Sequence, residues 1–408
     1  MRPCLKHNQK GFTLVELMIT IVIFLLVIIA ASNIFSSLLN QFKQQSKIAE
    51  SNIEGIIGLE MLRSDIEQAG YGLPWDLNGA AYTEAGVVTD PWSTIWTDRQ
   101  LNDGPPNNPV RGTDLGHPTS NPPGAIRALS GEALNGSDVL CIKATNIATN
   151  DTVKKWTYVL NTGANSVYQT AFNVADEDLL NNDRIIVIRP VLGTRERVLL
   201  RDSTGQFYAN FNSNLATFGG TGNNADFLPF ANTFLAHIFY GISPSTANPR
   251  MPFNRADYYV RQPATGMPTQ CAPGSGILYK AVLSNNDTVN DTSTPPGSPT
   301  LTELPLLDCV ADMQVVFALD ANGDGTTDNW GDTNATLTAA NIRDQLKEVR
   351  VYILAHEGQR DNAYTSAATI TATDPNVGAV INYDAATAGT RNYRWKIYTM
   401  VVTPYNLR

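Results

Sequence analysis

The feature that most constrains this chain is an uninterrupted apolar stretch close to its start. Residues 12–31 comprise 20 positions, of which only Glu16 is charged. A helix rises ~1.5 Å per residue, so this stretch would be about 30 Å long, which is the thickness of a bilayer core. The ten residues before it carry three positive charges and no negative one. Because basic flanks stay in the cytoplasm, the sequence predicts one membrane span with the remaining chain outside.

A carboxylate inside a membrane helix needs a partner, because its insertion costs roughly 2.5–3.5 kcal/mol. The stretch around it, Lys10-Gly11-Phe12-Thr13-Leu14-Val15-Glu16, resembles the processing signal of type IV prepilins and of type II secretion pseudopilins. The resemblance implies that a prepilin peptidase cuts between Gly11 and Phe12 and methylates the new amine of Phe12. It also implies that Glu16 pairs with the terminal amine of a neighbouring subunit and sets the axial register between the two.

Two other interpretations of the N-terminus fit less well. A removable secretory signal would have a shorter apolar core that ends at a small-residue cleavage site. A plain signal anchor would need neither Gly-Phe at the border of the apolar stretch nor a lone glutamate at this offset. We therefore interpret residues 1–11 as a prepilin leader peptide.

The helical pattern continues beyond the span without a proline until Pro74. One helical stripe of small and apolar residues recurs at intervals of three, four or seven: Ile48, Gly55, Leu59, Leu62, Ile66 and Ala69. The segment Gly70-Tyr71-Gly72 followed by Pro74 is a helix stop. The sequence thus predicts one long helix over residues 12–70, with 12–31 in the membrane or filament core. The remaining residues, 71–408, form an extracytoplasmic head.

The head reads as a β-rich domain with large loops. The predicted strands are β-branched or aromatic runs separated by Gly, Asn and Pro: Val139–Ala144, Trp156–Leu160, Arg184–Ile188, Arg197–Leu200, Leu235–Tyr240, Tyr258–Arg261, Ile277–Leu283, Met313–Leu319, Val349–Leu354 and Tyr393–Val402. One short helical pattern, Ala339–Lys347, interrupts them. There is no βαβ alternation, so we expect an α+β fold in which the long helix packs on a mainly antiparallel sheet.

Polar or proline-rich stretches predict the loops of the head. These are most of residues 71–135, Ser284–Thr300 and Asp361–Asn392. Three tryptophans, Trp75, Trp92 and Trp96, stand in the first of these segments. They read as a local cluster that covers the helix, with a partner-binding surface as the alternative.

A second resemblance is carried by two patches, Leu59–Gly72 and Leu306–Phe317. Both are similar to segments of the PilW-type minor pilins. That family implies a non-enzymatic subunit that joins other minor and major pilins, initiates pilus assembly and sits near the pilus tip, often with a large adhesin. It implies an inner-membrane location before assembly and an extracellular pilus afterwards. Whether the pilus serves twitching motility, cell adhesion or DNA uptake is open, and a minor pseudopilin of type II secretion is the alternative.

Composition agrees with an extracytoplasmic protein. Lys and Arg number 29 against 38 Asp and Glu, for a net charge of −9. Loss of the leader with its three basic residues lowers this to −12. Nucleic-acid binding needs a basic stripe, so no such partner is expected.

The cysteines predict one disulfide. Cys4 is lost with the leader, and Cys141 lies in an apolar strand pattern, where a buried thiol is the usual interpretation. Cys271 and Cys309 flank one polar, proline-rich excursion and are 38 positions apart. We therefore expect a Cys271–Cys309 disulfide, worth about 4 kcal/mol on the chain-entropy model.

One acidic loop matches the start of a calcium-binding pattern, D-x-[DN]-x-[DN]-G. It runs Asp320-Ala321-Asn322-Gly323-Asp324-Gly325-Thr326-Thr327-Asp328. The expected structural Ca²⁺ ligands are Asp320, Asn322, Asp324, the Thr326 carbonyl and Asp328. Position twelve is Gly331 where a helical EF-hand needs glutamate, so the nine-residue version found on β-loops fits better. An ordinary Asp/Asn/Gly turn is the alternative.

Catalytic patterns are not found. His117, His237 and His356 are far apart in sequence, and there is no H-E-x-x-H, G-x-S-x-G or P-loop. Each histidine reads as a packed or surface residue. The alternative from another class of protein, a metal-dependent enzyme held by a signal anchor, therefore has little support. We expect no enzyme activity.

Overall fold

The protein was analysed as a computed structural model that describes residues 11, 13–84, 101–103, 121–161, 166–168, 177–194, 196–230, 233–244, 248–283, 285, 301–331 and 337–407. The chain divides into two compact units, Met1–Asn52 and Ile53–Arg408. Helix α1 (Leu14–Glu67) contributes residues to both.

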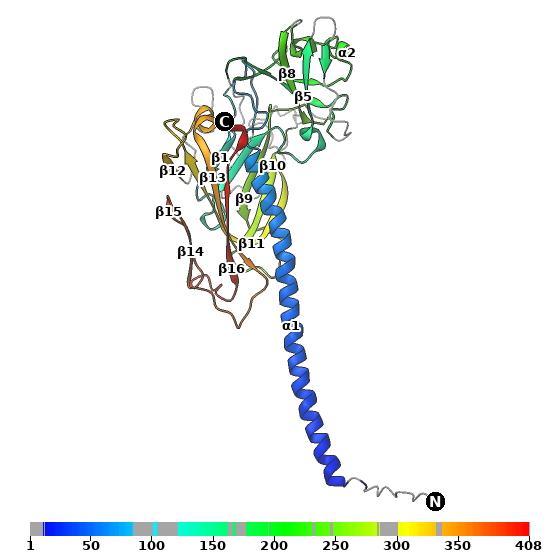
Figure 1. Cartoon of the computed structure of the whole chain (residues 1–408), viewed down its shortest axis with the longest axis vertical. Coiled ribbons are helices and arrows are strands. Elements are labelled where there is room, and N and C mark those ends of the chain that lie inside the picture. The colour runs from blue at the N-terminus through cyan, green and yellow to red at the C-terminus, as the bar shows by residue number, and fades with distance from the viewer. Residues whose placement is uncertain are drawn as a thin grey trace, which may run out of the picture. The chain divides into compact units, whose positions relative to one another are not determined.

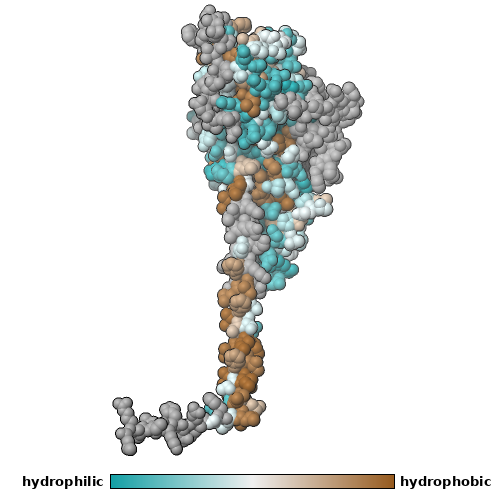
Figure 2. All heavy atoms as spheres, turned by 90° about the vertical axis from the view of Figure 1, so that its right-hand side faces the viewer, coloured by the Kyte–Doolittle hydropathy of each residue, from teal (hydrophilic) through white to brown (hydrophobic). Residues whose placement is uncertain are grey.

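The first unit contains the apolar part of α1. Leu14–Ser36 is 23 residues long, apolar enough to cross a membrane, and none of its most apolar window is buried by the chain. Figure 2 shows this section as a nearly continuous brown, hydrophobic surface. The predicted apolar helix is therefore confirmed, whereas Phe12 lies outside the described residues.

The larger sheet of the second unit has eight strands, and every pairing in it is antiparallel. In spatial order they are β1 (Ile126–Leu129), β2 (Val139–Ala144), β9 (Asn254–Arg261), β10 (Gly276–Leu283), β11 (Leu301–Leu319), β13 (Leu346–Glu357) and β16 (Arg394–Val402), with β12 (Asn329–Gly331) paired to β11. Figure 1 shows the end of α1 beside this sheet. All residues of β9 and β10 are buried, as expected of strands covered on both faces.

A smaller, six-stranded antiparallel sheet follows the order β4 (Ser166–Tyr168), β3 (Trp156–Asn161), β8 (Thr233–Ser243), β5 (Arg184–Pro190) and β6 (Arg197–Leu199), with β7 (Tyr208–Asn210) paired to β5. A separate hairpin joins β14 (Thr369–Asp374) to β15 (Gly378–Asp384). The short helices are α2 (Leu215–Gly219), α3 (Ala339–Gln345) and the 3-10 turns η2 (Leu134–Gly136), η3 (Asp151–Lys154), η4 (Asn224–Phe227) and η5 (Tyr405–Leu407). The expected α+β fold with mainly antiparallel sheets is confirmed, and each predicted strand lies in or overlaps an observed one.

The loop predictions need two corrections. Asp361–Asn392 contains the β14–β15 hairpin, in which alternate residues, Ala372 and Ile381 among them, are buried against Tyr352 and Leu354 of β13. Threonines and asparagines on the other face conceal this alternation in the sequence. The segment 71–135 contains strand β1 where an irregular connection is predicted. Of Ser284–Thr300, only Asn285 is described, and it is buried.

The outer part of α1 packs on β11 at two glycines. A Cβ on Gly58 would lie 2.1 Å from the Leu306 carbonyl oxygen, and one on Gly55 would lie 2.8 Å from Leu307 Cδ1. Further along the helix, towards its C-terminal end, Leu62 and Ile66 are fully buried in the main core. Asp65 accepts a hydrogen bond from Tyr258 and forms an ion pair with Lys280 (Nζ–Oδ2 2.5 Å). The helix is thus held against the sheet by close backbone approach, apolar burial and one partly buried charge pair.

We predict that Gly58→Ala lowers the free energy of unfolding, although alanine is the better helix former by about 1 kcal/mol. The added methyl group meets a backbone carbonyl that cannot rotate away, and overpacking of this kind costs about 1–3 kcal/mol. Gly55→Ala is the matched control, because the Leu307 side chain can move. Thermal unfolding of the full chain in detergent measures both variants. A Gly58→Ala protein at least as stable as Gly55→Ala would contradict the close contact.

Candidate functional site

The residues of the prepilin signal that the structure describes lie at the start of α1. Gly11 has open space around its Cα, and Glu16 is exposed in the first turn. The backbone N–H of Glu16 donates to Thr13 Oγ1 (3.3 Å), and Thr20 Oγ1 donates to the Glu16 carbonyl (3.0 Å). In the described part of the chain Glu16 has no ion-pair partner. Phe12, the predicted site of methylation, lies outside the described residues.

The predicted disulfide is confirmed. Cys271 and Cys309 are bonded with their Cα atoms 4.8 Å apart, and Cys141 is a buried free cysteine. Cys309 has a φ of +57°, unusual for a residue other than glycine, and lies at a register shift in the pairing of β11 with β10. The covalent bond therefore fixes an irregular point of the central strand to the segment before β10.

A buried histidine lies against this disulfide. A ring nitrogen of His356 and both Sγ atoms lie within 4.8 Å of one another. The His356 Nε2 accepts a hydrogen bond from the Ala272 N–H (2.8 Å), and Tyr393 and Trp395 pack on the ring. Burial lowers the pKa of His356 to about 4, so it is neutral at pH 7. Because the two sulfurs are bonded to each other, they supply no thiolate to a metal, and His356 is a packed residue here.

The acidic loop after β11 is ordered by hydrogen bonds from its own backbone. Asp320 is buried and accepts from the N–H groups of Gly323 (2.6 Å) and Gly325 (2.9 Å). Both glycines have positive φ, +78° and +92°, which permits the tight turn. Asp328 accepts from the N–H groups of Ala321 and Asn322 (3.0 and 3.2 Å). The five predicted ligand residues are thus gathered in one coiled loop.

Two nitrogen donors lie among these oxygens. The Asn322 amide nitrogen donates to Asp324 Oδ2 and to Asp328 Oδ1, both at 3.2 Å. The Lys347 ammonium lies 3.1 Å from Asp320 Oδ2. The oxygen ligands therefore fit a hard cation in kind, but Ca²⁺ would have to replace the amide contacts and compete with Lys347 for Asp320.

The most heavily buried polar group in the head is one that the sequence interpretation did not include. Six charged residues, all at most 2% exposed, form one ionic network: Glu84, Asp103, Arg127, Lys143, Arg255 and Asp257. Lys143 and Arg255 are opposite each other on β2 and β9, as are Cys141 and Asp257. They alternate with the apolar residues that contact α1, so the network lies on the other face of the sheet.

Direct contacts join the network together. Lys143 Nζ lies 2.8 Å from Glu84 Oε2 and 2.7 Å from Asp103 Oδ2. Arg255 binds Asp257 through two hydrogen bonds (2.9 and 2.7 Å) and Glu84 through a third (3.2 Å). Arg127 binds Asp103 at 3.0 Å. Three cations match three carboxylates, which offsets the cost of burying each charge.

The pKa values of Glu84 and Asp103 are shifted in opposite directions. Burial raises the pKa of Glu84 to about 7 and outweighs the attraction of Lys143. Burial also opposes ionisation of Asp103, but Lys143 and Arg127 outweigh it and lower its pKa. Asp103 thus carries the firmly held negative charge, and Glu84 is the member of the network that gains a proton first.

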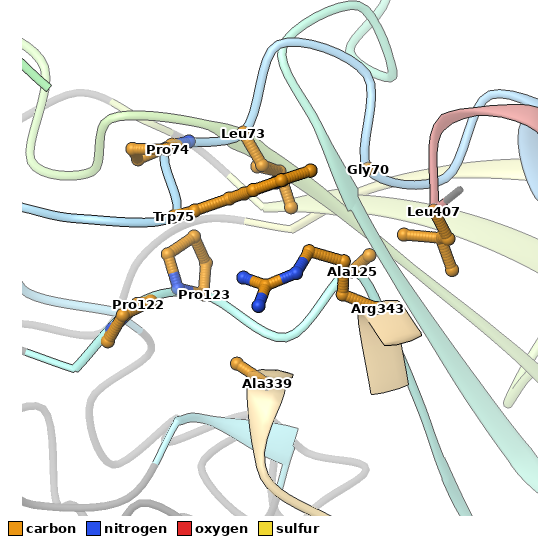
Figure 3. A pocket seen from close by; sticks show the side chains of 10 residues that line it. All are labelled: Gly70, Leu73, Pro74, Trp75, Pro122, Pro123, Ala125, Ala339, Arg343 and Leu407. Atoms are coloured by element: carbon orange, nitrogen blue, oxygen red, sulfur yellow. The ribbon is translucent and has the colours of Figure 1, made fainter. Parts of the chain in front are cut away.

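Trp75 marks the junction between the end of α1 and the two sheets. Its indole is held between two guanidinium groups, with Arg343 of α3 4.3 Å and Arg197 of β6 4.9 Å from the ring. Figure 3 shows the Arg343 side chain below the indole, next to Pro123 and Ala125. The remaining space between Gly70, Trp75 and Leu407 is only about 10 Å³, enough for one water molecule. Trp75 is half-buried, and it also lines a hollow of about 380 Å³ together with Arg197 and Tyr240. Trp92 and Trp96 lie outside the described residues.

Comparison with known families agrees with this architecture. A model of the prokaryotic N-terminal methylation motif matches residues 6–32, which gives the chain the signature of a prepilin-type protein. A model of the type IV pilus-assembly protein W matches residues 257–406, from β9 to η5. Together the two matches agree with both resemblances drawn from the sequence, to type IV prepilins and to PilW-type minor pilins, and they support a subunit associated with type IV pili. No curated protein and no solved structure matches the chain.

The two matches also qualify the sequence interpretation. Of the two patches that resemble PilW-type proteins, Leu306–Phe317 lies inside the matched range and Leu59–Gly72 outside it. The ionic network lies mostly before residue 257, and only Asp257 falls within the match. The PilW family is a structural component of pili and not an enzyme family, in line with the expected lack of enzyme activity.

We predict that replacing Glu84 changes how stability depends on pH. The native pKa of Glu84 is about 7, above its ordinary value of 4.5, so the native state binds this proton more tightly than the unfolded state. Its contribution to stability is therefore complete below pH 4.5 and is lost as the pH rises through 7, with a slope of at most about 1.4 kcal/mol per pH unit.

Glu84→Gln keeps the hydrogen-bonding shape but does not titrate. The unfolding free energy of wild type minus that of the variant should fall between pH 4.5 and 7 and become level above pH 8. Denaturant unfolding of the full chain across this range measures the difference. Glu60→Gln, at an exposed position on α1, is the control for the loss of one carboxylate from the chain. A flat difference for Glu84→Gln would contradict the raised pKa.

Proposed function

We propose that this protein is a minor pilin that a prepilin peptidase processes, and that it takes part in initiating pilus assembly and in forming the pilus tip. Before assembly it resides in the inner membrane with its N-terminus in the cytoplasm. Its partners are the peptidase, other minor pilins and the major pilin, and a large tip adhesin is a further candidate. A minor pseudopilin of a type II secretion system is the alternative.

The observation that carries this proposal is Glu16 on the apolar helix. Its carboxylate has no ion-pair partner in the described part of the chain, yet a charge within a membrane or a filament core needs one. After cleavage at Gly11 the new terminal amine is a cation four residues away along the chain. Pairing between the amine of one subunit and Glu16 of the next satisfies both charges and fixes the stagger between subunits.

The head supports a specialised subunit. The described part of the head contains two sheets and a separate hairpin, and it is cross-linked by one disulfide. The PilW match covers only the second part of this head, so the earlier part, with the six-stranded sheet, is additional to the matched domain. Such an addition suits a subunit present in few copies at an end of the filament, where it need not repeat along the fibre.

We predict that Glu16→Gln leaves processing intact and reduces incorporation into pili by at least about tenfold. The peptidase acts on the border at Gly11, whereas the carboxylate is needed only when subunits pair. Mass spectrometry of the N-terminus reports cleavage and methylation of Phe12, and immunoblots of sheared pili report incorporation. Glu60→Gln, on an exposed position of the same helix, is the matched control.

The outcome also separates the alternatives. Full incorporation of Glu16→Gln would contradict the pairing role. Loss of surface pili in a deletion strain supports a minor pilin, while loss of protein secretion with intact pili supports the pseudopilin. A deletion that changes neither would leave both without support.

We also propose that the acidic loop binds one structural Ca²⁺ through Asp320, Asn322, Asp324, the Thr326 carbonyl and Asp328. The support is their gathering in one glycine-turned loop that begins directly after β11. Extracellular calcium modules bind at roughly 10⁻⁴–10⁻³ M, so the ion would be held where calcium is plentiful. Its role would be to fix the path from β11 toward α3.

We predict that 5 mM CaCl₂ raises the melting temperature of the full chain above its value in chelator, and that Asp324→Asn removes this increase. Asp384→Asn is the control, because Asp384 also accepts hydrogen bonds from the backbone of its own turn but belongs to no calcium pattern. Equal melting temperatures with calcium and with chelator would show that the loop is only a turn.

A further inference from the structure

One open hollow lies at the six-stranded sheet, in the second unit and away from the disulfide and the acidic loop. It has a volume of about 660 Å³, within the range usual for small-ligand sites. The strands β3, β5 and β8 contribute Asn161, Arg189 and His237. The segments after β6 and around η4 contribute most of the remaining lining, in particular Arg201 and Phe230, and Asn78 comes from the segment after α1. Figure 1 shows β5, β8 and α2 together at this end of the head.

Two arginines of this hollow have no polar partner within the part of the chain that the structure describes. Elsewhere in the described head, guanidinium groups are engaged, as Arg350 is with Asp374 and Arg261 is with Glu303. Arg189 and Arg201 form neither a hydrogen bond nor an ion pair with any residue that the structure describes. Arg360 shares this state but lies in the loop after β13. Two guanidinium groups that lack a partner among the described residues and line one hollow are therefore an arrangement that a ligand would complete.

A buried histidine adds an acceptor to the two donors. The His237 Nδ1–H donates to the Phe227 carbonyl at 2.8 Å, which fixes the tautomer and leaves Nε2 as an acceptor. Burial, together with the nearby charge of Arg189, lowers the pKa of His237, so the ring is neutral at pH 7. A neutral imidazole held in this way accepts a hydrogen bond from a hydroxyl group and does not attract an anion.

The acidic residues of the hollow are held by their own loops. Asp202 Oδ1 accepts from the N–H groups of Thr204 and Gln206 (2.8 and 2.9 Å). Asp226 Oδ2 accepts from the Ser203 N–H (2.7 Å). The two carboxylates balance the two guanidinium charges, so the hollow has no net charge to attract a dianion such as phosphate. The remaining lone pairs of these two carboxylates can accept hydrogen bonds from hydroxyl groups.

From this arrangement we propose that the hollow binds an acidic saccharide, with the carboxylate of a uronic-acid ring held by Arg189 and Arg201. A planar guanidinium fork matches a carboxylate through paired hydrogen bonds. Asp202, Asp226 and His237 Nε2 accept the ring hydroxyls. The lining of Leu228, Pro229 and the 76%-exposed Phe230 offers an apolar surface to the C–H face of the ring. This binding is independent of processing and pilus assembly.

The test is binding of sodium galacturonate to the full chain in detergent, measured by calorimetry and by saturation-transfer NMR. Galactose, phosphate and sulfate are the comparison probes. We expect saturable binding of galacturonate, with galactose at least about tenfold weaker because it lacks the charge-assisted hydrogen bonds. Arg189→Gln and Arg201→Gln should each weaken galacturonate about tenfold or more, and Arg360→Gln should not change it.

Lysine variants keep the test decisive if a glutamine variant is unstable. Arg189→Lys and Arg201→Lys retain the charge but lose the fork, so they should also weaken binding while their melting temperatures stay at the wild-type value. Failure of galacturonate to saturate the protein would overturn the proposal. Equal or tighter binding of phosphate or sulfate would likewise overturn it, as would wild-type affinity in both arginine variants.

Discussion

The contact on which the head depends most is the one between α1 and β11. Gly58 brings the helix backbone against the Leu306 carbonyl, and the same strand pairs with β10, β12 and β13. It also carries Cys309, whose disulfide anchors the segment before β10, and ends directly before the acidic loop. A displacement of β11 would therefore change the packing of the helix and the positions of the disulfide and the acidic loop. The strand that packs against α1 thus also connects the disulfide and the acidic loop.

The two faces of the large sheet are stabilised by different physics. The α1 face is apolar, with Leu62, Ile66 and Tyr258 buried in one cluster. On the opposite face, Lys143 and Arg255 gather carboxylates from segments distant in sequence. Apolar burial does not depend on the orientation of the contacting groups. Removal of one partner from a buried ion pair, in contrast, leaves an uncompensated charge and costs about 3–5 kcal/mol. The ionic face therefore specifies one arrangement of the chain, while the apolar face supplies most of the driving force.

The sequence predicts those features whose cause is local. The apolar length, the helical stripe and the strand runs give the long helix and the mainly antiparallel head, and the position of Cys141 in a strand leaves Cys271 and Cys309 to pair. The β14–β15 hairpin was missed because its outward threonines mask a period of two. The ionic network was missed because Glu84 and Arg255 are 171 positions apart. A signal was nevertheless present, since Lys143 stands within an otherwise apolar strand. Arg255 and Asp257 stand directly before the predicted strand Tyr258–Arg261, and both lie within the observed β9.

The long separations within the network also bear on how the head folds. Lys143 meets Glu84 across 59 positions, and Arg255 meets it across 171. Contacts so distant in sequence form slowly, because the entropy of closing a long loop is lost before the contact contributes any stabilisation. Until β9 is in place, Glu84 lacks its contact with the Arg255 guanidinium, and this side of the network remains hydrated. Closure of that face is thus expected to be a late step in folding, one that distinguishes a finished head from a partly folded one.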